Sequence, residues 1–272
     1  MLLLVAFAQT TFGQLNGIYS IGTAGIVPAE TGNYASLSAA VTALNTNGVS
    51  GPCTFYFTNS GTYTEASDLG LGYTGGSITN TVIFKPYTGI VCTISFSSTA
   101  TRASGIDGHL IIGASDITSA PPSTLKPINY LTIDGSNNGT NSKDLTINGV
   151  ATTATKSVVR IFGDNNNITI KNCVITNNST SGSTTAPISV TNYFSSPLNY
   201  TPDNITIQNN TLNSLGGNGS TGLLTGNSGT PTVGQTNLII SSNTISSRAT
   251  RAIITNYVSD ATIADNTIDH NP

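Results

Sequence analysis

Three aspartates and three basic residues lie close together in the middle of the chain, where they could do chemistry. They are Asp134, Asp144, Asp164, Lys156, Arg160 and Lys171. Converging carboxylates bind Ca²⁺ or act as acid and base on sugars. Aspartate in a turn also has a sufficient local role as an acceptor, and Asp134 and Lys171 occupy equivalent strand positions, where a surface ion pair is the simplest arrangement. We therefore assign no catalytic residue and no metal, and keep Ca²⁺ as the only cofactor this set could hold.

The histidines and cysteines predict no site of their own. His109 and His270 have no partner at metal-ligand spacing, so we expect neither to bind a metal. The spacing of Cys53, Cys92 and Cys173 is not that of a metal site either. Cys53 and Cys92 could pair in an oxidising compartment, although burial as small apolar side chains is the simpler expectation.

Two similar triplets indicate a surface for binding. Thr191-Asn-Tyr193 and Thr255-Asn-Tyr257 recur at the end of a predicted strand, with Thr225-Gly-Asn227 between them. Tyrosine can stack on a sugar ring and asparagine can hydrogen-bond its hydroxyl groups. Strand termination alone would also explain the pattern. The candidate glycan contacts are Arg160, Thr191, Asn192, Tyr193, Thr225, Asn227, Thr255, Asn256 and Tyr257.

The composition narrows the class of protein. Charged residues make up 8% of the 272 residues, and Asn, Thr and Ser together fill about two-fifths of the chain. Nine Lys and Arg residues cannot form the basic stripe of a nucleic-acid binder. A net charge of −3 and abundant β-branched residues argue against charge-driven disorder.

A short repeated segment predicts the fold. Its copies are 167–175, 204–212, 237–245 and 260–268, with a weaker copy at 144–149. Apolar and polar residues alternate in each copy, as in a strand, and a second strand precedes each one, at 158–162, 188–193, 223–227 and 253–257. One such coil cannot bury its apolar stripe alone, but stacking coils at about 4.8 Å per rung buries it. The sequence therefore predicts an all-β, right-handed parallel β-helix.

The repeat also assigns side chains to the two faces. Matching corner positions hold Cys173, Asn210, Asn243 and Asn266, and we expect these to form a structural ladder along the axis. In the strands that precede each copy, successive side chains point to opposite faces. With Val159 and Ile188 pointing inward, we expect Gly222 and Leu224 to point inward as well, and Leu223 and Thr225 to point outward.

The N-terminal part differs from the repeats. Ser36–Asn47 has apolar residues at helical spacing, a capping Ser36 and a terminating Gly48, which predicts a short helix that covers the first coil. The apolar stretch 2–12 reads as the end of a signal peptide and is too short to span a membrane. We expect a signal remnant at 1–14, a cap with the first rungs at 15–125, and regular rungs at 126–272 that continue beyond the chain.

Two segments carry a resemblance to known proteins. The run Tyr34–Leu44 followed by Gly61-Thr-Tyr-Thr-Glu65 resembles the cap of pectin-lyase-like β-helix proteins. Leu131-Thr-Ile-Asp-Gly135 and the Asn-rich rungs are similar to β-helix domains of large bacterial surface proteins exported by the type IX secretion system. The resemblance covers about 15–272 and implies the fold. It is weak for activity, because these proteins include lyases, hydrolases, esterases and non-catalytic adhesins.

These observations favour a secreted or cell-surface module that is not an enzyme and serves as an adhesin, stalk or glycan contact. Its partners would be a polysaccharide or surface glycan and further domains of the same chain, with no nucleic acid and no membrane span. The alternative is a polysaccharide lyase or glycoside hydrolase that acts on acidic polysaccharide.

Overall fold

The computed structural model shows a right-handed parallel β-helix with three sheets, in agreement with the predicted fold class. The residues described are 13–100, 107–117, 124–151, 156–180, 185–191, 193–195, 198–215, 221–226, 234–247 and 251–270. The predicted signal remnant therefore lies almost wholly outside them. No helix in these ranges is long and apolar enough to cross a membrane.

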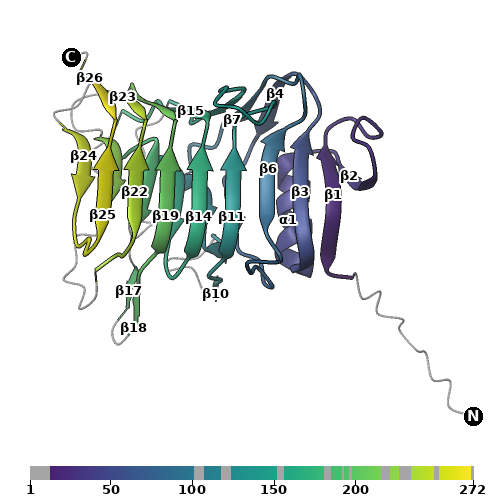
Figure 1. Ribbon diagram of the computed structural model, residues 1–272, viewed down its shortest axis with the longest axis horizontal. Coiled ribbons are helices and arrows are strands. Elements are labelled where there is room, and N and C mark those ends of the chain that lie inside the picture. Colours follow the sequence, from purple (N-terminus) through teal and green to yellow (C-terminus); the bar gives the residue numbers. More distant parts are fainter. Residues whose placement is uncertain are drawn as a thin grey trace, which may run out of the picture.

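Sheet A runs the length of the coil and faces the viewer in Figure 1. Its strands, in spatial order, are β2 (Glu30–Tyr34), β1 (Leu15–Ile21), β3 (Val49–Phe57), β6 (Val82–Pro86), β11 (Asn129–Asp134), β14 (Asn166–Lys171), β19 (Asp203–Gln208), β22 (Leu238–Ser241) and β25 (Ala261–Ala264). Every pairing between them is parallel.

Sheets B and C form the other two sides. Sheet B consists of β4 (Gly61–Glu65), β7 (Cys92–Phe96), β12 (Leu145–Asn148), β15 (Cys173–Asn177), β20 (Thr211–Ser214), β23 (Thr244–Ser247) and β26 (Thr267–His270). Sheet C consists of β5 (Leu69–Leu71), β8 (Gly108–Ile112), β13 (Ser157–Phe162), β16 (Ile188–Thr191), β21 (Thr221–Thr225) and β24 (Arg251–Thr255). Two antiparallel hairpins project from the coil, β9 (Ala114–Asp116) with β10 (Thr124–Leu125) and β17 (Tyr193–Ser195) with β18 (Leu198–Tyr200).

The alternation of the repeat places the core as predicted. In β14, Ile168 and Ile170 point into the coil and are fully buried, while Thr169 between them lies on the outer face. Ile170 pairs with Ile207, and each further coil adds one aliphatic residue to the row. The weaker copy at 144–149 is not equivalent to the start of the other copies. It forms β12, which pairs with β15 in sheet B, while the sheet A strand of that coil is β11.

The corner ladder is present at the predicted positions. Asn210 Oδ1 accepts from the backbone N–H of Cys173 at 3.0 Å, and the Asn210 side-chain amide donates to the Ile170 carbonyl at 2.9 Å. Asn243 and Asn266 repeat this pattern one coil further each time. The left-handed backbone belongs instead to the preceding residues, Asn172, Asn209, Ser242 and Asp265. The corner therefore uses one residue to turn the chain and the next to satisfy its buried backbone groups.

Strand β21 of sheet C has the phase opposite to the one predicted. Ile188 pairs with Leu223 and Ser189 with Leu224, so Leu223 is fully buried in the core and Leu224 lies on the outer side. Thr225 follows Leu223 inward, since it pairs with the core residue Val190. The prediction was wrong because two consecutive leucines offer an apolar residue in either phase, and a shift of one residue exchanges the faces.

A short helix covers the N-terminal end of the core, as predicted. Helix α1 (Leu37–Asn47) begins at Ser36, whose side chain accepts from the backbone N–H of Ala39, and ends at Gly48 with φ 64°. Its buried face of Leu37, Ala40, Val41 and Leu44 packs behind sheet A beside the first strands.

The three cysteines are buried and free, which confirms the simpler expectation. Burial raises the pKa of Cys53 to about 11 and that of Cys92 to about 12. Both are therefore protonated, unreactive core side chains at neutral pH.

Candidate functional site

The outer face of sheet A holds a polar groove of about 290 Å³. It crosses neighbouring strands from the residue before β6 to β22. The lining residues are Thr81, Tyr130, Thr132, Asn167, Thr169, Asn204, Thr206 and Asn237. Strands about 4.8 Å apart make the stretch from β11 to β22 roughly 15 Å long, which suits a short extended chain.

Two columns of side chains build the groove. Thr132, Thr169 and Thr206 are direct partners on β11, β14 and β19, so their side chains stand in one row. The second column lies two residues earlier in each strand, where the backbone is left-handed. It consists of Tyr130, Asn167, Asn204 and Asn237, with φ between 50° and 57°.

Asparagine is suited to this second column because it tolerates left-handed backbone better than other residues with side chains. Asn204 donates to Asn166 Oδ1 at 2.8 Å, and the amide of Asn237 donates to Asn204 Oδ1. These hydrogen bonds between coils hold the amides in a row beside the threonine hydroxyl groups.

Tyr130 departs from this rule. It is a bulky residue at φ 57°, a conformation that costs about 1 kcal/mol or more for such a side chain. It places a half-buried aromatic ring at the end of the groove. Backbone strain of this kind is often retained where a side chain has a role in binding.

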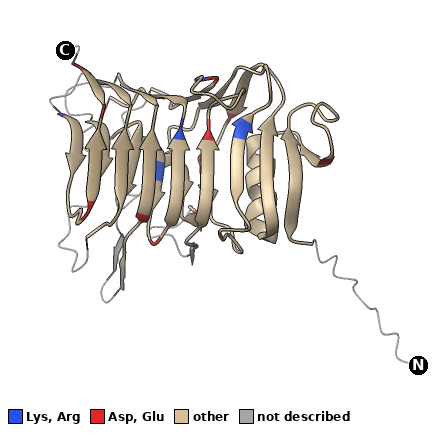
Figure 2. Cartoon of the chain, viewed as in Figure 1, with Lys and Arg blue, Asp and Glu red and all other residues tan. Residues whose placement is uncertain are grey.

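Charge is absent from the lining of the groove as far as the described residues show. Figure 2 shows a tan centre on the sheet A face, with charged positions at the arrowheads of β6, β11 and β14 and an acidic position at the start of β19. On β11 and β14 these are Asp134 and Lys171, which form an ion pair of 3.3 Å. That pair confirms the predicted surface ion pair.

Asp134 and Asp144 of the predicted set also accept hydrogen bonds from nearby backbone groups. Asp134 Oδ1 accepts from Ser136 N at 3.0 Å, and Asp144 Oδ2 accepts from Asn137 N at 3.0 Å, so each closes a turn. Burial and the neighbouring Asp203 raise the pKa of Asp164. In the ranges described, no group of three or more His, Cys, Asp or Glu could hold a metal ion.

A buried cluster of charge was missed by sequence reasoning. Lys156 Nζ lies 2.7 Å from Asp68 Oδ2, and His109 Nδ1 lies 2.9 Å from Asp68 Oδ1. The side chains of Asp68 and Lys156 have no exposed surface. His109, predicted to stand alone, thus has a carboxylate partner. The three residues lie at the starts of three successive strands of sheet C. Their equivalence could not be recognised from the sequence, because the repeated segment does not extend into the irregular N-terminal coils.

Arg160, predicted to point outward, does so from β13 but is buried. It is 5% exposed, and its Nε donates to Ser189 Oγ on the next strand at 3.1 Å. Burial lowers the pKa of Arg160 to about 10, and the opposing effect of Asp107 does not cancel it.

The predicted glycan contacts are divided between the interior and the surface. Arg160 and Thr191 are buried, and Thr225 is fully buried in the inward phase. Asn192, Asn227 and the side chain of Tyr193 lie outside the described residues. Thr255, Asn256 and Tyr257 are exposed at the end of β24 and directly after it. The members that the structure describes therefore do not share one exposed face.

Glu65, the last residue of the Gly61-Thr-Tyr-Thr-Glu65 segment, contacts the capping helix. It is 4% exposed, and its Oε1 accepts from the backbone N–H of Ser38 at the start of α1. Burial raises the pKa of Glu65, against the hydrogen bonds from Ser38 and Leu37.

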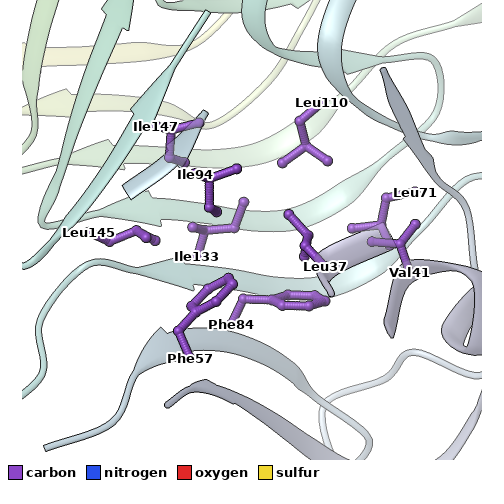
Figure 3. Close-up of a pocket in the computed structure, with 10 residues that line it drawn as sticks. All are labelled: Leu37, Val41, Phe57, Leu71, Phe84, Ile94, Leu110, Ile133, Leu145 and Ile147. Carbon is purple, nitrogen blue, oxygen red and sulfur yellow. The ribbon is translucent and has the colours of Figure 1, made fainter. Parts of the chain in front are cut away.

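A second cavity lies inside the coil where α1 meets the first rungs. Figure 3 shows its ten apolar lining residues, among them Leu37, Phe84 and Leu145. Its volume of about 20 Å³ leaves room for about one water molecule, so it is a packing void rather than a ligand site.

Comparison with known proteins finds likeness of shape alone. No protein-family profile and no curated protein matches the chain. Among solved structures, the A-module of mannuronan C-5 epimerase AlgE6 from Azotobacter vinelandii aligns with 96% of this chain at 11% identity and TM-score 0.33, and the chain spans 57% of that module. A pectin methylesterase from Aspergillus niger aligns with 96% of this chain and 88% of its own at 15% identity and TM-score 0.31. The fold assignment rests on the strand order and pairing of the chain itself.

Proposed function

We propose that this protein is a non-catalytic β-helix module of a secreted or cell-surface protein, and that it binds a neutral glycan along the outer face of sheet A. The observation that carries the proposal is the groove, lined by threonine hydroxyl groups, asparagine amides and one tyrosine. Hydroxyl and amide groups match the alternating donors and acceptors of a sugar, and a tyrosine ring can stack on its apolar face.

The absence of charge from the described lining selects the class of glycan. An acidic polysaccharide would need a basic residue opposite each carboxylate, and hydrolysis would need carboxylates on both sides of the scissile bond. Lys171 and Asp134 neutralise each other at the edge of the face. A neutral glycan that is bound and not cleaved requires neither the basic residues nor the carboxylates. Its hydroxyl groups can hydrogen-bond to the threonine and asparagine side chains of the groove.

Rigidity supports the same role. The lining side chains stand on adjacent strands held by parallel ladders, so little conformational entropy is lost when a ligand binds. A solenoid that presents a flat, regular face suits a stalk or adhesin that contacts an extended polymer.

The test is isothermal titration with neutral oligosaccharides of six sugars, with oligogalacturonate as the acidic comparison. We expect binding of one or more neutral chains, and a loss of about tenfold in affinity for Thr169→Val or Thr206→Val, since each removes one hydroxyl group and keeps the β-branched shape. Thr146→Val on sheet B is the matched control, because Val174 already occupies the neighbouring position in that row.

Product analysis separates the proposal from the enzymatic alternative. The same oligosaccharides are incubated with the protein and analysed for new reducing ends and unsaturated sugars. Turnover of any of them, or binding that Thr169→Val and Thr206→Val leave unchanged, would overturn the proposal.

A further inference from the structure

We propose that Lys156 and Asp68 form an intramolecular isopeptide bond that ties two coils of the β-helix together. The two side chains meet at the corner between sheets B and C, where Asp68 precedes β5 and Lys156 precedes β13. Strand β8 lies between these two in sheet C, so the contact spans the intervening coil.

The first argument is proximity in a site without solvent. Lys156 Nζ is 2.7 Å from Asp68 Oδ2, and neither side chain has exposed surface. Nζ also lies 3.3 Å from the Ser98 carbonyl oxygen, a contact from the intervening coil that fixes its position. An amine held against a carboxyl group in this way has a high effective concentration, and excluded water cannot hydrolyse the product.

The second argument is the third member of the cluster. His109 Nδ1 lies 2.9 Å from Asp68 Oδ1, the second oxygen of the same carboxyl group. The imidazole stacks on Phe96, with ring centroids 5.3 Å apart and planes inclined by 15°, so its direction is held. A hydrogen bond donated to Oδ1 draws electron density from the carboxyl carbon and stabilises the oxyanion that forms during attack.

The reaction is a condensation that needs no oxidant or cofactor. The Lys156 ammonium group passes one proton to Asp68 Oδ2, which produces a neutral amine and a carboxylic acid. Nζ attacks the carboxyl carbon, a tetrahedral intermediate forms, and a second N–H proton passes to the leaving hydroxyl group. The C–O bond breaks, one water molecule leaves, and an amide joins the two side chains. Two buried charges that are costly to desolvate thereby become one neutral group.

The consequence is a covalent tie parallel to the axis of the coil. It would enclose a loop whose ends are 88 residues apart, which restricts the unfolded chain. A covalent bond of this kind would raise the resistance of a stalk to mechanical tension. The coils that it joins could not separate by successive rupture of the hydrogen bonds between rungs.

The experiment is intact mass spectrometry of the full chain under denaturing conditions, directly after purification and after incubation for several days. Once the N-terminal residue is established, we expect a mass one water molecule below that of the sequence. We also expect a branched chymotryptic peptide that contains both Asp68 and Lys156. A wild-type mass equal to that of the sequence at both times overturns the proposal, whatever the variants do.

Variants test which residues form the bond and whether His109 assists the reaction. Lys156→Met and Asp68→Ala should each restore the full mass, and His109→Phe, which keeps the stacked ring, should slow the loss of water at least tenfold. Lys171→Met is the matched control: it removes the half-exposed lysine that pairs with Asp134, and the mass deficit should persist. A deficit that survives Lys156→Met would place the bond elsewhere and refute the assignment. An unchanged rate in His109→Phe would refute the part given to His109.

Discussion

The side chain of Asn243 accepts two hydrogen bonds from Asn210 in the coil before it. The Asn210 backbone N–H lies 2.9 Å from Asn243 Oδ1, and the Asn210 side-chain amide lies 3.1 Å from the same atom. Asn243 in turn donates to the Ile207 carbonyl at 2.9 Å. One buried side chain thus satisfies two backbone groups and a side-chain amide at the corner of the preceding coil, and the ladder couples each coil to the next.

Removal of a ladder side chain should therefore unpair several groups at once. We expect Asn243→Ala to lower the free energy of unfolding by about 2–4 kcal/mol, measured by urea denaturation. Asn266→Ala should cost less, because Asn266 is half-buried and water can replace it. Asn213→Ala is the control on the outer side of sheet B, and should stay within about 0.5 kcal/mol of wild type. Equal effects at all three positions would show that the ladder is not cooperative.

Tyr130 links stability to the proposed binding function. Tyr130→Asn gives this position the residue that Asn167 and Asn204 provide in the next coils, at the same left-handed backbone. We expect the free energy of unfolding to rise by about 1 kcal/mol as strain is relieved, and affinity for a neutral oligosaccharide to fall because the ring is lost. Urea denaturation and titration calorimetry measure the two effects. A variant that is less stable than wild type would show that the ring packs more strongly than the backbone is strained.

Loss of charge should destabilise the protein far more at the buried Arg160 of sheet C than at the half-exposed Lys171 of sheet A. Lys171→Met removes one partner of an ion pair in which the lysine is 37% exposed, and should cost less than about 1 kcal/mol. Arg160→Met leaves buried polar groups around it without their donor and should cost about 3 kcal/mol or more. Thermal unfolding followed by circular dichroism compares them. The expectation fails if Lys171→Met is the more damaging change.

Glu65 predicts a pH dependence of stability. Its folded-state pKa is raised above the ordinary 4.5 by burial, so the folded protein holds this proton more tightly than the unfolded chain does. The stabilisation is complete below about pH 4.5 and is lost as pH rises through the raised pKa. Between pH 4.5 and the raised pKa, the free energy of unfolding of wild type should fall relative to that of Glu65→Gln. At higher pH the difference between the two proteins should stay constant. Urea denaturation at a series of pH values gives the difference curve, and a constant difference would contradict the shift.

The sequence by itself determined the coil, the corner ladder and the capping helix. Each depends on neighbours in the chain or on a repeated segment: Ile168 and Ile170 alternate with polar residues, Asn210 and Asn243 recur at one corner, and Ser36 and Gly48 bound an amphipathic run. The pairing of Asp134 with Lys171 followed from the same repeat.

Only the tertiary structure decided which polar residues are exposed. Thr225 lies inside because Leu223 rather than Leu224 packs against Ile188, a choice of phase that periodicity leaves open. Lys156, Asp68 and His109 converge from coils whose loops differ in length, so their distance in space is unrelated to their spacing in the chain. The groove of sheet A likewise arises from the stacking of coils, which places Thr132, Thr169 and Thr206 one strand apart although long loops separate them in the sequence.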